Sequence, residues 1–425
     1  MTAIAEGAEV TSKRRATPAE KRATVIGIVL IALAVFTFWA FGLGVTSGLE
    51  SKFNLSLPGA RFDDLSWTVN SRMVGFVVSL ILAFLGGMTL RRSHLKWTNL
   101  GLSIGLGLFA FSFLTWAAAD GSFSLVGMLT STVVLSVPVT LGALTGLMCE
   151  RVAVINIAIE GQLLTSAFVG TIVGSAAGIW VGLVAAMLTG AILGAVLAVL
   201  AIKYRIDQII AGVVINIFAL GITSFLARRV LSASQELNSP GRFGSIKIPI
   251  LGDIPVIGPM FFDHNMFVYV TFILVIALHF GLFYTRWGLR SRSVGEHPKA
   301  ADTVGINVYR TRYRNVILGG LIAGFGGAFL TLAQVSRFEE NLTAGIGFIG
   351  LAALIFGRWR PLGVLGAGLV FGFARALQQK LGILGTPIPS EFLSMTPYIV
   401  TLIVVAGVVG RARPPAADGQ PYIKD

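Results

Sequence analysis

The sequence predicts an all-α integral membrane protein with about 10–12 transmembrane helices, one of them a short broken half-helix. Three observations lead to this fold class. Hydrophobic residues make up 55% of the 425 residues and charged residues only 12%, about half the charged share of a typical soluble domain. The apolar residues are grouped in runs of about 17–25, the length that spans a bilayer. The 51 glycines suit close helix packing in lipid, where small residues let backbones approach.

The apolar runs that can cross a bilayer follow one another along the chain. In order, they cover residues 23–45, 73–90, 99–119, 125–148, 154–176, 178–201, 208–227, 265–285, 315–336, 361–377 and 395–410. A shorter run, 346–357, lies between the ninth and the tenth, and it covers only ~18 Å of a ~30 Å hydrocarbon core. We expect a broken half-helix or a re-entrant segment there, buried in protein or lining a cavity. In the ninth run, Gly320, Gly324 and Gly327 form a smooth helix face suited to packing.

The sequence divides into a cytoplasmic tail (1–22), N-terminal transmembrane helices (23–120), a larger transmembrane core (121–411) and a second cytoplasmic tail (412–425). We expect both tails to be disordered. With both termini in the cytoplasm, most of the 33 lysines and arginines lie on the inner side, as the positive-inside rule requires. This bias favours a full crossing by the short run, because a re-entrant segment would move the C-terminal tail outside.

Polar groups enter the fifth run within the stretch CERVAVINIAIEG, which begins at Cys149. On a helix that begins near Val154, Asn156 and Glu160 share a face, and Glu160 lies about 10 Å along the axis. An ionisable group at that depth usually faces a cavity or a partner in the bundle. We therefore expect Asn156 and Glu160 to face a translocation path or the bundle interior. The structural alternative is a hydrogen bond between helices that fixes the fold.

Further polar candidates lie near these two residues in pattern or in sequence. Asn216 in VINIFALG occupies the position of the asparagine in VINIAIEG. The similarity indicates either an internal repeat of the kind common in transporters or a coincidence of composition. Gln208 begins the run that contains Asn216. Glu150 and Arg151 lie at the membrane edge, where we expect them to set the start of the following helix.

The only sizeable loop on the inner side joins the eighth and ninth runs and contains SVGEHPKAADTVGIN. Pro298 can begin a short helix and Gly305 can end it, because proline suits the first helical position and glycine the position after the last. A simple positive-inside anchor would not need this helix. We therefore favour a surface that docks a cytoplasmic partner over an anchor.

Several classes of function are disfavoured by what the sequence lacks. No G-x-x-x-x-G-K-[ST] stretch occurs, so we expect no ATP site of the P-loop type. No nucleophile–base pair or metal-ligand spacing is found, so we expect neither an enzyme nor a cofactor in this chain. The basic residues flank apolar spans instead of forming a stripe on a polar domain, which argues against nucleic acid as a partner. The energy for any transport must then come from another subunit or from an ion gradient.

Three motifs resemble those of a known family. ERVAVINIAIEG, SVGEHPKAADTVGIN and GFIGLAALIFGRWRPLG are similar to motifs of the inner-membrane permease subunits of ABC importers for nucleosides and simple sugars, which are related to the branched-chain amino-acid permeases. The resemblance covers residues 125–410, and the first two apolar runs with the tail before them look like an addition to a ten-span core. The chain departs from the family at Ala153 and Ala158, where glycine is usual.

The resemblance implies partners and roles. Residues 296–305 would form the coupling helix that seats in a groove of a separate ATPase subunit, which would carry ATP and Mg²⁺. The implied coupling residues are Arg292, Gly295, Glu296, Pro298, Lys299, Ala301, Asp302 and Gly305. Asn156 and Glu160 match an Asn and a Glu of the family motif. A second permease subunit, different or identical, would complete the pore, and an extracytoplasmic binding protein would deliver a small-molecule substrate.

The leading interpretation is a multi-pass permease of the plasma (inner) membrane that imports nucleosides or simple sugars with energy from the ATPase. Phe348 could stack on a base, although packing explains it as well in a chain with 29 phenylalanines. The alternative is a proton-coupled secondary transporter that uses Glu160 as the proton carrier and needs no ATPase. An integral-membrane enzyme would need clustered acidic, His or Cys residues.

Overall fold

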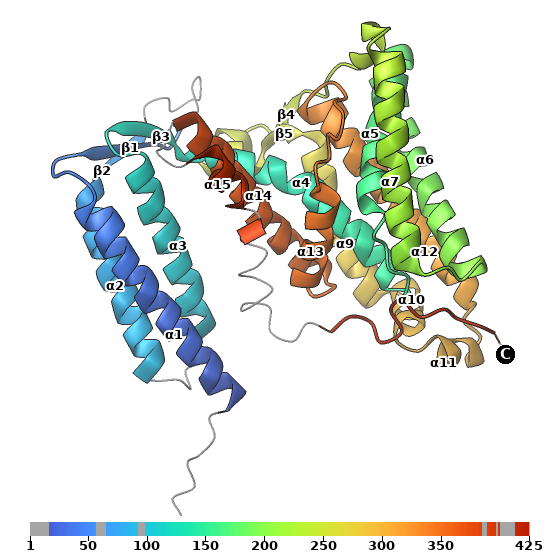
Figure 1. Cartoon of the computed structure of the whole chain (residues 1–425), viewed down its shortest axis with the longest axis horizontal. Helices are drawn as coiled ribbons and strands as arrows, with labels where there is room; N and C mark the ends of the chain where they lie inside the picture. The colour runs from blue at the N-terminus through green and yellow to red at the C-terminus, as the bar shows by residue number, and fades with distance from the viewer. Residues whose placement is uncertain are drawn as a thin grey trace, which may run out of the picture. The chain divides into compact units, whose positions relative to one another are not determined.

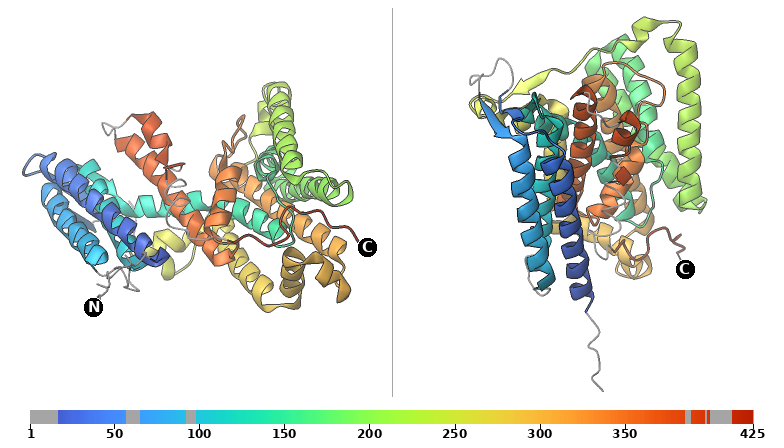
Figure 2. Two further views of the ribbon diagram at one scale, coloured as in Figure 1. Left: turned by 60° about the horizontal axis from the view of Figure 1, so that its bottom comes forward. Right: turned by 60° about the vertical axis from the view of Figure 1, so that its left-hand side comes forward.

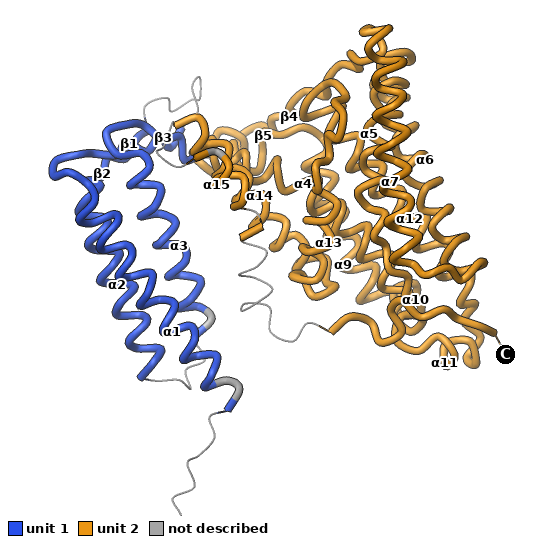
Figure 3. The backbone as a smooth tube through the Cα atoms, in the orientation of Figure 1, with its two compact units in different colours: residues 1–56, 63–125 blue, residues 57–62, 126–425 orange. Residues whose placement is uncertain are grey.

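The computed structural model describes residues 17–56, 65–91, 98–384, 389–396, 398–399 and 413–424. The chain forms two compact units (Figure 3): residues 1–56 with 63–125, and residues 57–62 with 126–425. Within the described residues, nine helices are long and apolar enough to cross a membrane, and only short strands accompany the helices. This confirms an all-α integral membrane protein.

The first unit contains three long helices, one more than the two runs set apart by the sequence resemblance. They are α1 (Pro18–Thr37), which continues as a π-helical turn over Phe38–Leu43, α2 (Ser71–Arg91) and α3 (Thr98–Ala117). A capping box begins α1, in which Thr17 and Glu20 each accept a hydrogen bond from the other's backbone N–H. The three helices lie side by side (Figure 1), and the buried Leu30 and Leu82 belong to the core between them.

A small sheet, which the sequence did not predict, joins the ends of these helices. Its order is β2-β1-β3, with β1 (Glu50–Asn54) antiparallel to β2 (Ser66–Asn70) and parallel to β3 (Gly121–Ser124). Phe53 is fully buried and stacks on Phe111 of α3, with ring centroids 5.5 Å apart. The strands are too short to show as alternating runs in so apolar a sequence.

The second unit is a helical bundle with small outer elements. Its long helices are α4 (Leu125–Glu150), α5 (Ile159–Ala177), α6 (Ile179–Ala198), α7 (Gln208–Leu226), α9 (Met266–Tyr284), α12 (Val308–Phe329) and α14 (Pro361–Leu384). Its shorter elements are α8 (Ile257–Phe261), α10 (Arg286–Glu296), α11 (Pro298–Thr303), α13 (Ile346–Phe356), α15 (Ser390–Ser394), β4 (Ser245–Lys247) and β5 (Asp263–Asn265). The short apolar run is therefore a shorter helix, α13. The run over residues 395–410 lies almost entirely outside the described residues.

Helices α4 and α12 form the centre of this bundle. In the most apolar stretch of each helix, 94% of the residues of α4 and 83% of those of α12 are buried. In the other candidate spans this share is 28–44%. The predicted packing face on α12 is confirmed: a Cβ on Gly190 of α6 would overlap the carbonyl oxygen of Gly320, and a Cβ on Gly327 would overlap the carbonyl oxygen of Leu163 in α5. Glycine is therefore required at these crossings, because any side chain would separate the backbones.

The C-terminal residues 413–424 are ordered against the bundle, contrary to the prediction of a disordered tail. We call them the C-terminal strap. Figures 1 and 2 show the end of the chain beside α10 and α11. Ala417 donates to the carbonyl oxygen of Gly295 at 3.0 Å, and Tyr422 is only 5% exposed, with its ring 5.3 Å from that of Tyr309. The polar composition concealed these two buried anchors, which hold the strap in place.

Candidate functional site

The segment between α4 and α5 is not helical, so the predicted helix start near Val154 is wrong. Ala153 has φ of 61°, and α5 begins only at Ile159. Asn156 and Glu160 therefore do not share a helix face. The apolar spacing of VINI fits a helix, but Ala153 turns the chain through the left-handed region, which favours glycine. Glycine is the usual residue of the resembled family at this position.

Three of the predicted polar residues hold this non-helical segment in place. Gln208 of α7 accepts a hydrogen bond from the backbone N–H of Ile155 at 2.7 Å. Asn216, two turns further along α7, donates to the carbonyl oxygen of Ile157 and accepts from the N–H of Gly161, both at 2.8 Å. Asn156 is fully buried and donates to the side chain of Gln162 at 3.1 Å. The amides of Gln208 and Asn216 thus bond backbone groups of a segment that has no helix or sheet pattern of its own.

Glu160 joins the start of α5 to the start of α13. Its side chain accepts hydrogen bonds from the N–H of Gly345 at 2.8 Å and of Gly347 at 2.6 Å. The first N–H groups of a helix have no partner inside it, and the positive end of the helix dipole favours a negative group there. Glu160 thus acts as the N-terminal cap of α13 from a distance of 185 residues in sequence.

The other end of α13 is held by the last residue of α4, Glu150, and the residue after it, Arg151. Trp359 donates its indole N–H to the carboxylate of Glu150, and Arg151 donates from Nε to the carbonyl oxygen of Trp359 at 3.0 Å. Arg358 and Trp359 have φ of 55° and 52°, so the chain turns sharply after α13. We call Glu150, Arg151 and Glu160 the clamp, because one motif holds both ends of α13.

Phe348 is placed apart from the buried candidates. It lies on α13 directly after Gly347, but its side chain is 49% exposed on the surface of the second unit. Asn156, Glu160 and Gln208 are each at most 9% exposed. Asn216 is half-buried and bonds the backbone of the same segment. The structure therefore brings four of the five residues together and leaves Phe348 on the open face of the helix that they support. A substrate path beside them stays a prediction.

The predicted short helix between the eighth and ninth runs is confirmed. Pro298 occupies the first position of α11, and Gly305 has φ of 83° after its end. The sequence reasoning missed the cap: the His297 side chain accepts a hydrogen bond from the N–H of Ala300 at 3.2 Å. Histidine is an unusual cap, so the Pro–Gly pattern was the stronger signal.

The predicted coupling residues divide into a supporting set and an exposed set. Gly295 and Ala301 are buried, and a Cβ on Gly295 would overlap the carbonyl oxygen of Arg151. The exposed members are Glu296, Lys299 and Gly305, and the half-buried members are Arg292, Pro298 and Asp302. Val304, which the sequence reasoning missed, is 75% exposed.

Arg151 connects the predicted docking surface, meaning the exposed residues of α10 and α11, to the clamp. Besides its contacts with Trp359 and Gly295, its guanidinium carbon lies 5.5 Å from the ring centroid of Phe283, and that of Arg292 lies 5.1 Å from the same ring. Burial lowers the pKa of Arg151 to about 10, so the side chain remains charged at neutral pH. Arg151 therefore contacts both the end of α10 and the turn that follows α13.

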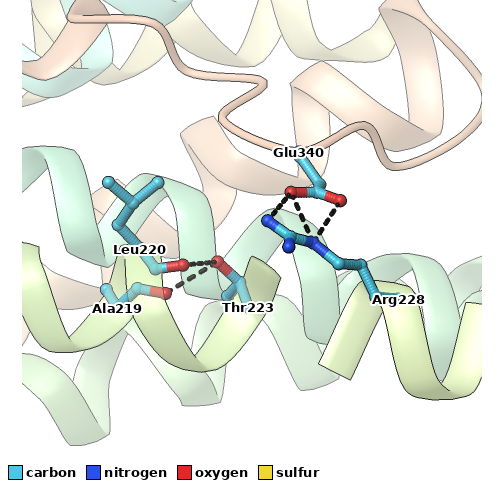
Figure 4. A network of polar contacts seen from close by, with 5 residues as sticks. All are labelled: Ala219, Leu220, Thr223, Arg228 and Glu340. Carbon is cyan, nitrogen blue, oxygen red and sulfur yellow. Dashed lines mark hydrogen bonds and ion pairs between the residues drawn. The ribbon is translucent and has the colours of Figure 1, made fainter. Parts of the chain in front are cut away.

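At the far end of α7 from Gln208, an ion pair joins the π-helical turn that continues α7 (Ala227–Leu231) to the loop before α13 (Figure 4). Arg228 grips Glu340 with a fork of hydrogen bonds, including Nη2 to Oε2 at 2.9 Å and Nε to Oε1 at 3.0 Å. The same bonds lower the pKa of Glu340. One turn earlier, Thr223 donates to the carbonyl oxygen of Ala219 at 2.7 Å. A cavity of about 460 Å³ lies beside this pair.

Comparison with known proteins places these features in context. Residues 128–406 match the family described as branched-chain amino acid transport system / permease component, so the first unit lies outside the match. The chain is similar to the guanosine ABC transporter permease protein NupQ of Bacillus subtilis. The two are 44% identical over 69% of this chain and 95% of NupQ. It is also similar to the nucleoside ABC transporter permease protein NupC of Lactococcus lactis. The two are 36% identical over 68% of this chain and 94% of NupC.

A further relative comes from an archaeon. The chain is 31% identical, over 67% of its length, to 92% of the putative glucose ABC transporter permease protein TsgC13 of Haloferax volcanii. No solved structure matches the chain at a significant level. Among the described residues, no group of three or more His, Cys, Asp or Glu side chains is placed to hold a metal ion.

Proposed function

Because the chain belongs to the family of branched-chain amino acid transport system permease components, we propose that it is the membrane-spanning subunit of an ATP-driven importer for nucleosides. It is a multi-pass membrane protein and a transport subunit, not an enzyme. Nucleosides are favoured over sugars because the relatives named for guanosine and nucleosides are 44% and 36% identical, against 31% for the relative named for glucose.

One observation carries the proposed mechanism: a continuous contact path from α11 to α13. An ATPase subunit, which holds ATP and Mg²⁺, docks on the exposed residues of α10 and α11 and moves them when it closes. Gly295 passes this motion to Arg151, and Arg151 passes it to Trp359 at the end of α13. Helix α13, held by Glu160 at its other end, then tilts and alternately opens the path to either side.

The remaining partners follow from the same proposal. A second permease subunit, identical or different, faces the open side of α13 and completes the pore. An extracytoplasmic binding protein delivers the substrate to the end of α7 and the loop before α13, which Arg228 and Glu340 join. Both termini lie in the cytoplasm of a plasma (inner) membrane, as the distribution of basic residues favours.

The proton-coupled alternative has no support. A proton carrier needs a carboxylate that can release and accept a proton during the cycle. Both oxygens of Glu160 instead accept hydrogen bonds from backbone N–H groups at the start of α13, so the carboxylate is engaged as a structural cap.

Uptake measurements test the proposal. Cells that lack their own nucleoside import and express this chain with its partner subunits should accumulate labelled guanosine, and ATP depletion should abolish the uptake. Glucose uptake without guanosine uptake would contradict the substrate assignment. Uptake that survives ATP depletion but is lost when the proton gradient collapses would contradict the energy source.

A further inference from the structure

A second cavity of about 460 Å³ lies between α10 and α12, next to the loop that leaves α11. This volume is in the range of small-molecule sites, about 300–1,000 Å³. The cavity is lined by Trp287, Arg290, Gly305, Ile306, Asn307, Arg310, Thr311, Arg314 and Asn315. No clamp residue lines this cavity, and Gly305 is the one predicted coupling residue that does.

The lining is strongly cationic. Arg290 comes from α10, and Arg310 and Arg314 lie one turn apart on α12. No acidic residue lines the cavity, and none of the three arginines forms an ion pair with another described residue. The three arginines are exposed, and a concave surface lined by charge of one sign attracts ligands of the opposite sign. Basic anchors that only set membrane orientation need no such convergence.

The lining also contains a buried hydrogen-bond donor without an acceptor. The indole Nε1 of Trp287 is buried and has no partner among the described residues. A buried donor left unpaired costs about 1–3 kcal/mol. The nearby amides are already engaged: Asn315 donates to Thr311 at 2.8 Å, and Asn307 accepts from the N–H of Arg310 at 2.8 Å. The cavity therefore offers donors and positive charge to a ligand rich in acceptors.

We propose that this cavity binds a phosphate ester. A phosphate group presents several acceptor oxygens and as many as two negative charges, which matches planar guanidinium forks better than a single carboxylate does. The volume leaves room for the group esterified to the phosphate, which would pack on the face of Trp287. The ester is either the headgroup of an anionic phospholipid or a soluble nucleotide, and the nucleotide source rests on the proposed nucleoside substrate.

Because of the position of the cavity, a bound ligand would affect the segment that joins α11 to α12. Gly305, Ile306 and Asn307 join α11 to α12 and also line the cavity. A phosphate bound between Arg290 and Arg314 would bridge α10 and α12, the two helices that carry α11. Occupancy would therefore stiffen the docking surface against the ATPase.

The test uses the full chain, purified with its partner subunits in lipid nanodiscs. Binding of labelled guanosine 5′-monophosphate is titrated, and retained phospholipids are identified by native mass spectrometry after exchange into phosphatidylglycerol or phosphatidylcholine. The variant R310Q/R314Q should lower the affinity for whichever phosphate ester binds at least about tenfold. W287F should lower this affinity less. R286Q, which removes an exposed arginine of α10 outside the cavity, should leave binding unchanged.

Each outcome decides a part of the proposal. Selective retention of phosphatidylglycerol, lost in R310Q/R314Q, identifies a lipid headgroup, whereas saturable nucleotide binding lost in the same variant identifies a soluble ester. If neither ligand binds, or if R286Q weakens binding as much as R310Q/R314Q, the site is overturned. Guanosine uptake by the unmodified chain is scored separately, so failure of the proposed function is distinguishable from failure of this site. Size-exclusion profiles confirm that each variant is folded.

Discussion

Glu160 uses its side-chain oxygens to accept hydrogen bonds from two backbone N–H groups at the start of α13. Hydrogen bonds to a charged group contribute about 1.5–3 kcal/mol. We expect Glu160→Ala to lower guanosine uptake strongly and to reduce the free energy of unfolding by about 3 kcal/mol, while membrane insertion is kept. Glu160→Gln retains one acceptor oxygen, so its stability and uptake should lie between those of the unmodified chain and Glu160→Ala. Thermal unfolding in detergent and uptake assays measure both effects. Normal uptake by Glu160→Ala would remove this residue from the mechanism.

Ala153 offers a test of local backbone strain. A non-glycine residue in the left-handed region costs roughly 1–2 kcal/mol, and the loss of one buried methyl group offsets part of the gain from its replacement. We expect Ala153→Gly to raise the free energy of unfolding by up to about 1 kcal/mol. Ala158 has φ of −71°, so Ala158→Gly is the matched control and should not stabilise. Equal effects in both variants would contradict the strain argument.

At this scale the sequence predicted which residues matter better than it predicted their partners. The burial cost of Asn156 and Glu160 pointed to internal contacts, and the structural alternative, a hydrogen bond between helices, describes the contact of Glu160 with the start of α13. The identity of that partner, 185 residues away, leaves no trace in helical periodicity. The left-handed turn at Ala153 was equally hidden, because alanine is a strong helix former.

The helix α11 is an element whose replacement should have one clear effect. If residues 298–305 are exchanged for a Gly/Ser linker of equal length, we expect the ATPase subunit to be lost on purification, because the rigid exposed surface disappears. His297→Ala removes only the cap, worth about 1 kcal/mol, and should weaken the association without abolishing it. Quantitative co-purification measures both. Retention of the ATPase by the linker variant would show that α11 is not the docking element.

The C-terminal strap should support the same docking surface. Its residues Ala416 and Ala417 donate to Glu296 and Gly295, and Gln420 accepts from the buried Arg312. We expect deletion of residues 413–425 to reduce uptake several-fold, because α10 loses these partners. Lys424→Ala is the control: it removes an exposed ion pair with Asp302 at 3.6 Å, and such pairs contribute little. Unchanged uptake after the deletion would show that the strap is dispensable.

Attachment of the strap should also depend on pH. Burial raises the pKa of Asp418 to about 6, above its usual value of 3.8. The folded state therefore holds this proton more tightly than the unfolded state does, so stability falls as pH rises from about 4 to 6. We expect hydrogen exchange of the strap to be slower, after correction for its intrinsic rate, at pH 5 than at pH 7. Asp418→Asn should reduce the difference. A strap equally protected at both pH values in the unmodified chain would contradict this assignment.

Elements were predictable where apolar length decided the outcome. The runs over residues 73–90 and 208–227 differ from α2 and α7 by at most two residues at each start. The Pro–Gly pattern correctly predicted α11. The strap and the small sheet were missed because their stability comes from a few tertiary contacts, such as those of Tyr422 and Phe53, which no local pattern encodes.

For the whole molecule, the predicted orientation can be tested by labelling. Val304 and Ile250 are 75% and 81% exposed, on the docking surface and on the loop before α8. An impermeant maleimide should react with Ile250→Cys in whole cells, and with Val304→Cys only in inside-out vesicles. The native Cys149 is buried and should remain unlabelled in both. Reversed labelling would place the docking surface outside the cell and contradict an ATP-driven mechanism.

The contact between α6 and α12 sets a limit on how this molecule can change shape. Gly190 of α6 and Gly320 and Gly324 of α12 approach so closely that main chain rests directly on main chain. Sliding one helix along the other would drive backbone atoms into each other, so this pair serves as a fixed frame. The motion that admits and releases substrate must then come from other helices that pack on this pair. A covalent cross-link between α6 and α12 at the glycine crossing should therefore leave transport intact.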